Sequence, residues 1–129
     1  MREATNYGFF LEGKRKLSIG FGNDQFIENS FLQKIFLGSN FPNPFSDGTV
    51  IPFRLPQGKD YEVELGVYDL MGRRAALLLD DVLTGGMYEI KWVGNDRSGK
   101  AVANGVYLYV LKVRQGQQEE KYLRKMVVR

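Results

Sequence analysis

From Phe41 to Arg129 the chain consists of short runs in which apolar and polar side chains alternate, and this alternation constrains its fold most. Between Tyr88 and Trp92, for example, two aromatic residues and an isoleucine alternate with Glu89 and Lys91. A period of two places such side chains on opposite faces of a β-strand. Turn residues separate the runs and no long helical pattern occurs. We therefore predict an all-β fold, an antiparallel β-sandwich of about seven strands.

Glycine- and proline-containing segments divide this region into strands. We expect turns at 56–60, 70–73, 84–86 and 115–117. Pro52 favours an edge position for its strand, because proline has no N–H group to donate to a sheet. The run 105–114 is apolar on both faces, which is typical of a central strand. The expected strands are 49–55, 61–69, 74–79, 87–92, 105–114 and 121–128.

The first 39 residues differ from the rest, so we divide the chain into 1–39, a hairpin and linker, and 40–129, the main domain. Two apolar runs within 7–21 flank the glycine-containing loop 12–15, which predicts a β-hairpin. A lone hairpin is marginal in water and must pack on the main domain, on another chain or on an upstream passenger. Because the main domain is complete without it, we expect the 7–21 hairpin to mediate self-association.

The composition excludes several kinds of chemistry. Histidine and cysteine are both absent, which removes histidine acid–base catalysis, thiol nucleophiles, disulfides and Cys/His zinc sites. The net charge is +3 and both signs are interleaved, so we expect no nucleic-acid binding. No nucleophile–base pair is visible in the sequence. We therefore expect a protein that is not an enzyme, with no catalytic residue, cofactor or metal site.

One loop leaves two interpretations open. Asn95, Asp96 and Ser98 make the segment 95–99 rich in side-chain oxygens, and calcium is bound by six to eight oxygens. Their spacing does not match an EF-hand. We favour an Asx-type turn, in which the side chains accept hydrogen bonds from nearby backbone N–H groups.

Five short motifs follow one another along the main domain. They are 40–45, 67–73, 92–99, 104–109 and 124–129. Their order and spacing resemble the C-terminal sorting domain of proteins exported by the bacterial type IX secretion system, also called Por secretion. The middle part is also similar to the immunoglobulin-like domain of the flagellar hook-capping protein, and this resemblance implies that the predicted sandwich of about seven strands is immunoglobulin-like.

The residues that carry the resemblance have structural interpretations of their own. The prolines of the first motif fix φ and stiffen the lead-in to the domain. Asp69 and Gly72 are typical of a turn between paired strands, with a positive φ at Gly72. The family-motif residues are Pro42, Asn43, Pro44, Asp69, Gly72, Gly105 and Tyr107.

The last predicted strand and the residue after it carry four basic residues and no acidic one. An edge strand with solvated basic residues would explain this, since such residues discourage edge-to-edge aggregation. The resemblance implies instead that the strand is part of the export signal, which a partner strand could recognise by pairing with its edge. Both interpretations stay open. The candidate recognition residues are Lys121, Tyr122, Leu123, Arg124, Lys125, Met126, Val127, Val128 and Arg129.

The resemblance implies that the domain is an address label for an upstream passenger. Such a passenger passes through the periplasm, crosses the outer membrane through the type IX translocon, and ends at the cell surface or in the medium. A surface sortase typically cleaves before the sorting domain and attaches the passenger to anionic lipopolysaccharide. The expected partners are this translocon and sortase. No apolar signal-peptide segment follows Met1, so we expect the signal peptide for crossing the inner membrane to lie upstream of this chain.

The alternative is a structural or carbohydrate-binding accessory domain. Tyr88, Trp92, Tyr107 and Tyr109 are the aromatic residues that could line a sugar-binding face. All four occur in alternating strand patterns, which favours core packing over an open face.

Overall fold

The structure is a computed structural model, and it describes residues 14–17 and 34–129. It is all-β and antiparallel, as predicted. The strands form one sheet in the order β1-β4-β3-β5-β6, and β2 pairs with β3 outside this path. Within the described residues, no helix is long and apolar enough to cross a membrane. The strands are β1 (Lys14–Leu17), β2 (Phe36–Leu37), β3 (Thr49–Asp69), β4 (Arg74–Trp92), β5 (Gly105–Gln115) and β6 (Gln118–Val128).

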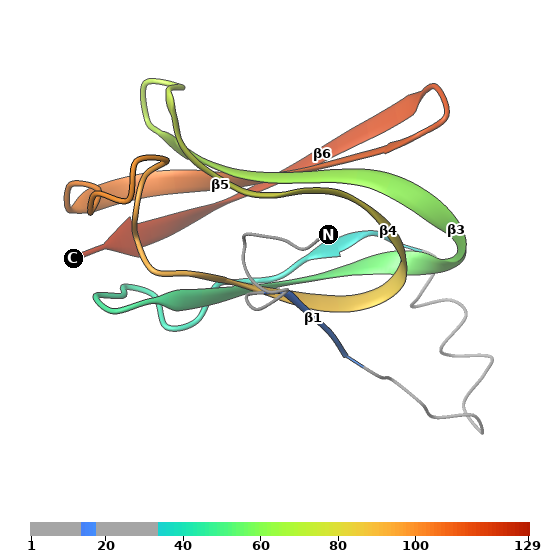
Figure 1. Ribbon diagram of the computed structural model, residues 1–129, viewed down its shortest axis with the longest axis horizontal. Helices are drawn as coiled ribbons and strands as arrows, with labels where there is room; N and C mark the ends of the chain where they lie inside the picture. The colour runs from blue at the N-terminus through green and yellow to red at the C-terminus, as the bar shows by residue number, and fades with distance from the viewer. Residues whose placement is uncertain (1–13, 18–33) are drawn as a thin grey trace.

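Two strands are long enough to belong to both layers of the molecule. β3 contains 21 residues and β4 contains 19. Figure 1 shows both strands curving from a lower layer, which includes β1, into an upper layer that β5 and β6 complete. The single sheet therefore curls over on itself as a half-barrel, with its two halves facing each other.

This architecture corrects two of the predicted turns. Segments 56–60 and 84–86 lie inside β3 and β4. The β3–β4 register shifts between Leu55 and Asp60, so the glycine and proline residues do interrupt the ladder, but the chain bends there instead of reversing. An immunoglobulin-like sandwich of about seven strands is accordingly not confirmed. The turns at 70–73 and 115–117 do reverse the chain, between β3 and β4 and between β5 and β6.

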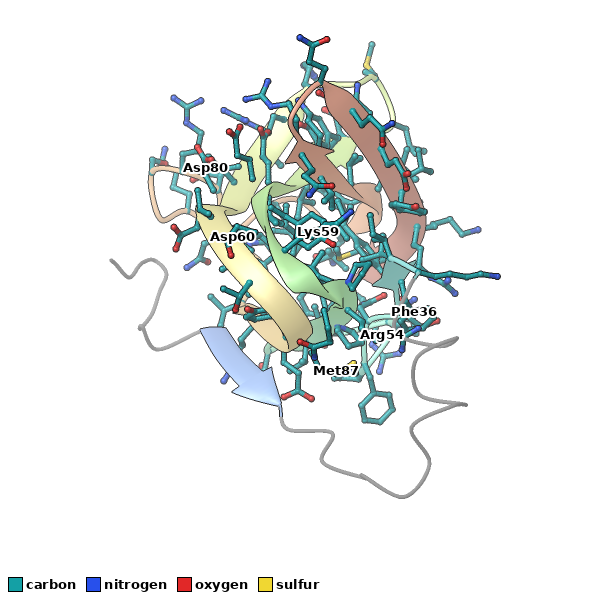
Figure 2. The ribbon with its side chains drawn as sticks, turned by 90° about the vertical axis from the view of Figure 1, so that its right-hand side faces the viewer. Phe36, Arg54, Lys59, Asp60, Asp80 and Met87 are labelled. Atoms are coloured by element: carbon teal, nitrogen blue, oxygen red, sulfur yellow. The ribbon has the colours of Figure 1, made fainter. Side chains whose placement is uncertain are left out.

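A close approach of two backbones allows the bend. A Cβ atom added at Gly85 would lie 2.2 Å from the carbonyl oxygen of Pro56 and 2.6 Å from the Cα atom of Gln57. Glycine leaves room for this close approach because it has no side chain. Figure 2 looks onto the bend, with Lys59 and Asp60 near the centre of the view.

The core fills the space between the two layers. Trp92 is 4% exposed, as predicted, and its ring packs edge-on against Phe45 with centroids 5.6 Å apart. Tyr88, Tyr107 and Tyr109 are buried as well. The sugar-binding face considered for these four aromatic residues is therefore wrong, because their rings form the interior of the domain.

The end of the predicted linker belongs to this core. Leu37 is buried, and β2 pairs with β3. Phe36 lies over Arg54, with the guanidinium carbon 4.9 Å from the ring centroid, and Figure 2 shows the two side chains together. Gly38 donates a backbone hydrogen bond to the carbonyl of Pro52, so the missing N–H of Pro52 faces the short β2 and not the β4 ladder. Pro52 therefore lies next to an edge, not on one.

The predicted hairpin is described only at 14–17, and its other residues lie outside the described part of the chain. Lys14 and Arg15, expected in the loop, instead begin β1, which pairs antiparallel with β4 from Ile90 to Met87. These four residues extend the sheet of their own chain. The expectation that the hairpin packs away from the main domain is wrong for them.

Candidate functional site

The candidate recognition residues form an edge strand with two different faces. β6 pairs with β5 in one unbroken register from Gly105–Val128 to Gln115–Gln118. On its inner face Met126 and Val128 are buried. On its outer face Lys121, Leu123 and Lys125 are exposed, and the side chain of Leu123 is 60% exposed. The basic segment is therefore an edge strand, with half of its side chains turned toward the domain and half turned to the outside.

The backbone of β6 offers unpaired hydrogen-bonding groups along its free edge. The N–H and C=O groups of Val127 point away from β5, because they bond to Asn43 and Phe45. In a regular antiparallel pair the groups of every second residue share this direction. Those of Lys125, Leu123 and Lys121 therefore point outward too, and no other described residue bonds to them. Such an edge is a template for an added strand.

Arg124 is exposed, but its guanidinium is engaged within the domain. Its guanidinium donates to the backbone carbonyl of Leu37 at 3.3 Å and to the side-chain oxygen of Ser39 at 2.8 Å. Hydrogen bonds to a charged donor are among the stronger ones in proteins. Arg124 therefore fastens the lead-in segment to β6, whereas Lys121 and Lys125 remain available to a partner on the outer face.

The Pro42-Asn43-Pro44 motif lies against the end of β6. The side-chain oxygen of Asn43 accepts a hydrogen bond from the N–H of Val127 at 2.9 Å. Phe45 donates to the carbonyl of Val127 at 3.0 Å and accepts from the N–H of Arg129 at 2.9 Å. The peptide bonds that precede both prolines are cis. The motif thus covers the last part of the edge and leaves 121–125 open.

A buried tyrosine fastens the same lead-in segment from the core side. The hydroxyl of Tyr109 donates to the carbonyl of Gly38 at 2.7 Å and accepts from the N–H of Asn40 at 3.0 Å. The Asn40 side chain in turn donates to Thr49 at 3.0 Å. Burial raises the pKa of Tyr109. Sequence analysis missed this network, although a tyrosine in an apolar strand implies a partner for its hydroxyl.

The remaining family-motif residues lie at the turn between β3 and β4 and at the start of β5. Asp69 accepts hydrogen bonds from the N–H groups of Met71 and Arg73, both at 2.9 Å, and its pKa is lowered mainly by the bond from the Arg73 backbone. Gly72 has a φ of +85° and Gly105 a φ of +152°. Tyr107 donates its hydroxyl to the carbonyl of Ala103 at 2.6 Å. The structure therefore gives these residues folding contacts.

The oxygen-rich loop is an Asx-type turn, as we favoured. One carboxylate oxygen of Asp96 accepts hydrogen bonds from the N–H and the hydroxyl of Ser98, and from the N–H of Lys100 at 3.0 Å. These bonds, led by the hydroxyl of Ser98, lower the pKa of Asp96. Among the described residues, no group of three or more acidic side chains is arranged to hold a metal ion.

Tyr122 lines an open cleft of about 810 Å³ between the bend of β3 and the β5–β6 hairpin. Its hydroxyl donates to Glu120. Burial, together with the hydrogen bond and the charge of Glu120, raises the pKa of Tyr122 to about 12. Lys34 and Lys59 line the same cleft, so its charge is mixed and does not define a ligand class.

No protein-family model and no curated protein sequence matches the chain. A crystal structure of dimeric latent PorU from Porphyromonas gingivalis is similar to 73% of this chain, at 27% identity and a TM-score of 0.63. PorZ, described as an essential bacterial surface component of the type-IX secretion system of the same organism, matches 77% of the chain at 26% identity and a TM-score of 0.46.

The matches are confined to small parts of much larger proteins. The chain corresponds to 9% of the PorU chain and to 12% of the PorZ chain. The similarity therefore concerns only a small part of each protein. The likeness to PorU shows that this part of the PorU chain shares the fold of most of the present chain.

Proposed function

We propose that residues 40–129 are a non-catalytic C-terminal sorting module of the type IX secretion system. The module directs an upstream passenger from the periplasm across the outer membrane, where a sortase cleaves before it and the passenger is attached to the surface or released. The likeness to PorU supports a role in this system. The finer assignment, to the immunoglobulin-like sorting domains, rests on the order of the five motifs.

The open edge of β6 is the observation that carries this proposal. Backbone groups of Lys121, Leu123 and Lys125 point outward without a partner among the described residues. A strand of the export machinery that pairs with this edge would gain main-chain hydrogen bonds for affinity. The exposed outer-face side chains would supply specificity, because they stand beside the added strand.

An export assay tests the proposal. The whole chain is fused to the C-terminus of a fluorescent protein that is delivered to the periplasm of a host with a type IX system. We expect the fusion to reach the surface or the medium. Fluorescence that stays in the periplasm would rule out the sorting role.

Charge reversal then tests whether β6 is recognised. Lys121→Glu with Lys125→Glu changes two exposed side chains and should alter stability by no more than about 0.5 kcal/mol each. We expect this variant to fold but to be exported poorly. Lys59→Glu with Lys91→Glu is the matched control, since it makes the same change at exposed positions outside β6. Equal export of the two variants would contradict recognition through the basic side chains of β6.

A further inference from the structure

The outer face of the upper layer carries apolar side chains that the core does not use. β5 is apolar on both faces, and its inner face forms part of the core. On the other side Leu108 and Val110 are only half-buried. The register places Leu123 of β6 beside Val110, and Gly66 of β3 and Leu77 of β4 continue the same row. Leu77 is 38% exposed and Leu123 is 60% exposed, whereas the ring of Tyr68 lies against Gly66, so this apolar row is open mainly at its two ends, on β4 and β6.

Charges beside this row are divided by strand. In the neighbouring row, Asp80 of β4 and Glu64 of β3 are acidic, whereas Lys112 of β5 and Lys121 of β6 are basic. Figure 2 shows Asp80 on the left flank of the molecule, on β4. The sheet order puts β4 and β6 at opposite sides of this face. This one row is therefore acidic on its β4 side and basic on its β6 side, with Glu64 and Lys112 already paired with each other at 3.8 Å, whereas Arg74 of β4 and Glu119 of β6 carry the opposite signs elsewhere on the face.

We propose that this outer face is a homodimer interface, with a second copy of the chain as its occupant. Two sheets pack face to face with their strands aligned in β-sandwiches. A half-turn about an axis parallel to the strands keeps each row over itself but reverses the strand order. β6 of one copy then lies over β4 of the other. Apolar row meets apolar row, and Lys121 of each copy faces Asp80 of its mate.

Charge complementarity selects this occupant and this orientation. A half-turn about an axis perpendicular to the strands would instead place β4 over β4 and reverse the order of the rows, so that Asp80 would not lie over Lys121 of the mate. Arg74 of β4 would lie over Lys125 of the mate, but Arg74 is already paired with Glu64 at 3.3 Å, which limits the repulsion. Asp80 is exposed and Lys121 has only a distant partner, Glu119, at 4.0 Å. Both are therefore free to pair across an interface.

The size of the face sets the strength of the contact. Four strands spaced about 4.8 Å apart and eight residues of about 3.4 Å each give roughly 500 Å² per copy. Stable interfaces bury about 800 Å² per partner, so we expect a weak, concentration-dependent dimer.

Sedimentation of the whole chain from about 10 µM to about 1 mM tests the proposal, because a contact of this size is expected to associate within that range. We expect the average mass to rise toward that of a dimer. Leu123→Asp should abolish the rise, whereas Val93→Asp, at a residue that is 48% exposed in a loop away from this face, should not. A mass that stays monomeric throughout, or that rises equally in both variants, would overturn the proposal.

Two charge-reversal variants test the orientation. Asp80→Lys places lysine against lysine in its own dimer, and Lys121→Glu places acid against acid, so each alone should associate at least tenfold more weakly. An equimolar mixture should recover association, because the introduced lysine of one copy then meets the introduced glutamate of the other, while the unchanged Lys121 of the first still meets the unchanged Asp80 of the second. A mixture that associates no better than the separate variants would overturn the proposed pairing.

Discussion

Asn43 and Val127 lie 84 positions apart in the sequence, yet the side-chain oxygen of Asn43 accepts a 2.9 Å hydrogen bond from the backbone N–H of Val127. The backbone of Phe45 forms hydrogen bonds with two residues at the end of the same strand segment, Val127 and Arg129. Arg124 adds contacts to Leu37 and Ser39. The lead-in to the domain and its last strand are therefore one structural unit, and a change at either end should be felt at the other.

Asn43→Ala should destabilise the domain by about 1 kcal/mol, the usual net contribution of one hydrogen bond. The substitution removes the acceptor for the N–H of Val127 and leaves the backbone bonds of Phe45 in place. Urea unfolding followed by tryptophan fluorescence measures the change, since Trp92 packs on Phe45. Asn104→Ala, at an exposed position with no side-chain hydrogen bond among the described residues, is the control. Equal unfolding midpoints for the two variants would show that this hydrogen bond does not stabilise the domain.

Gly85→Ala should be more damaging, by about 2–3 kcal/mol, because overpacking of this kind displaces backbone. The new methyl group would lie 2.2 Å from the carbonyl oxygen of Pro56, where the backbones of β3 and β4 approach each other closely. Thermal unfolding measures the loss. Gly99→Ala, where a Cβ meets nothing within 4 Å but φ is +90°, shows the cost of backbone strain alone. A smaller loss at Gly85 than at Gly99 would mean that this close approach tolerates a side chain.

Gly72→Val should cost about 1–3 kcal/mol through backbone conformation alone, because a β-branched residue tolerates a φ of +85° poorly. A Cβ atom at this position meets nothing within 4 Å, so steric contact does not contribute. Gly72→Asn should cost less, since asparagine adopts positive φ more readily. Denaturant unfolding midpoints measure the stability of both variants. The same loss of stability for valine and asparagine would argue against backbone conformation as the cause.

Acid should weaken the domain below about pH 4. The folded pKa of Asp96 lies below its ordinary value of 3.8, because the hydroxyl and N–H of Ser98 and the N–H of Lys100 bind the carboxylate. A lowered folded pKa stabilises the fold above the unfolded value, and this contribution is lost as the pH falls through the folded value. Melting temperatures from pH 7 to pH 2 should therefore fall less steeply for Asp96→Asn than for the exposed control Asp47→Asn. Parallel pH profiles would show that Asp96 does not contribute.

Alternation in the sequence predicted the strands that pair regularly, because their buried side chains repeat every second residue. It failed at 56–60 and 84–86, since proline and glycine are compatible with a reversal of the chain and with a bend inside a strand. Whether the chain reverses or bends depends on a tertiary contact, the close approach of the Gly85 backbone to Pro56. The linker prediction failed at Leu37 for a similar reason. Its burial is visible only once β2 pairs with β3.

The candidate site was predictable as a strand but not as a surface. The run of basic residues in β6 indicated an exposed strand, and Lys121 and Lys125 are indeed exposed on its outer face. The sequence pattern grouped Arg124 with these two lysines as a candidate recognition residue. Its hydrogen-bond partners Leu37 and Ser39 lie 87 and 85 positions away in the sequence. No local pattern encodes such partners, which is also why the contact between Asn43 and Val127 escaped prediction.

Export of a Leu123→Pro fusion is the most direct test of recognition through the open edge of β6. Proline removes the outward N–H of Leu123 and leaves the hydrogen bonds between β5 and β6 intact, because those come from the neighbouring residues. Leu123→Thr, which changes the side chain and keeps the N–H, is the control, and circular dichroism establishes that both variants are folded. The account predicts that the threonine variant is exported and that the folded proline variant stays in the periplasm. Export of the proline variant at the level of the unmodified chain would contradict recognition by strand addition.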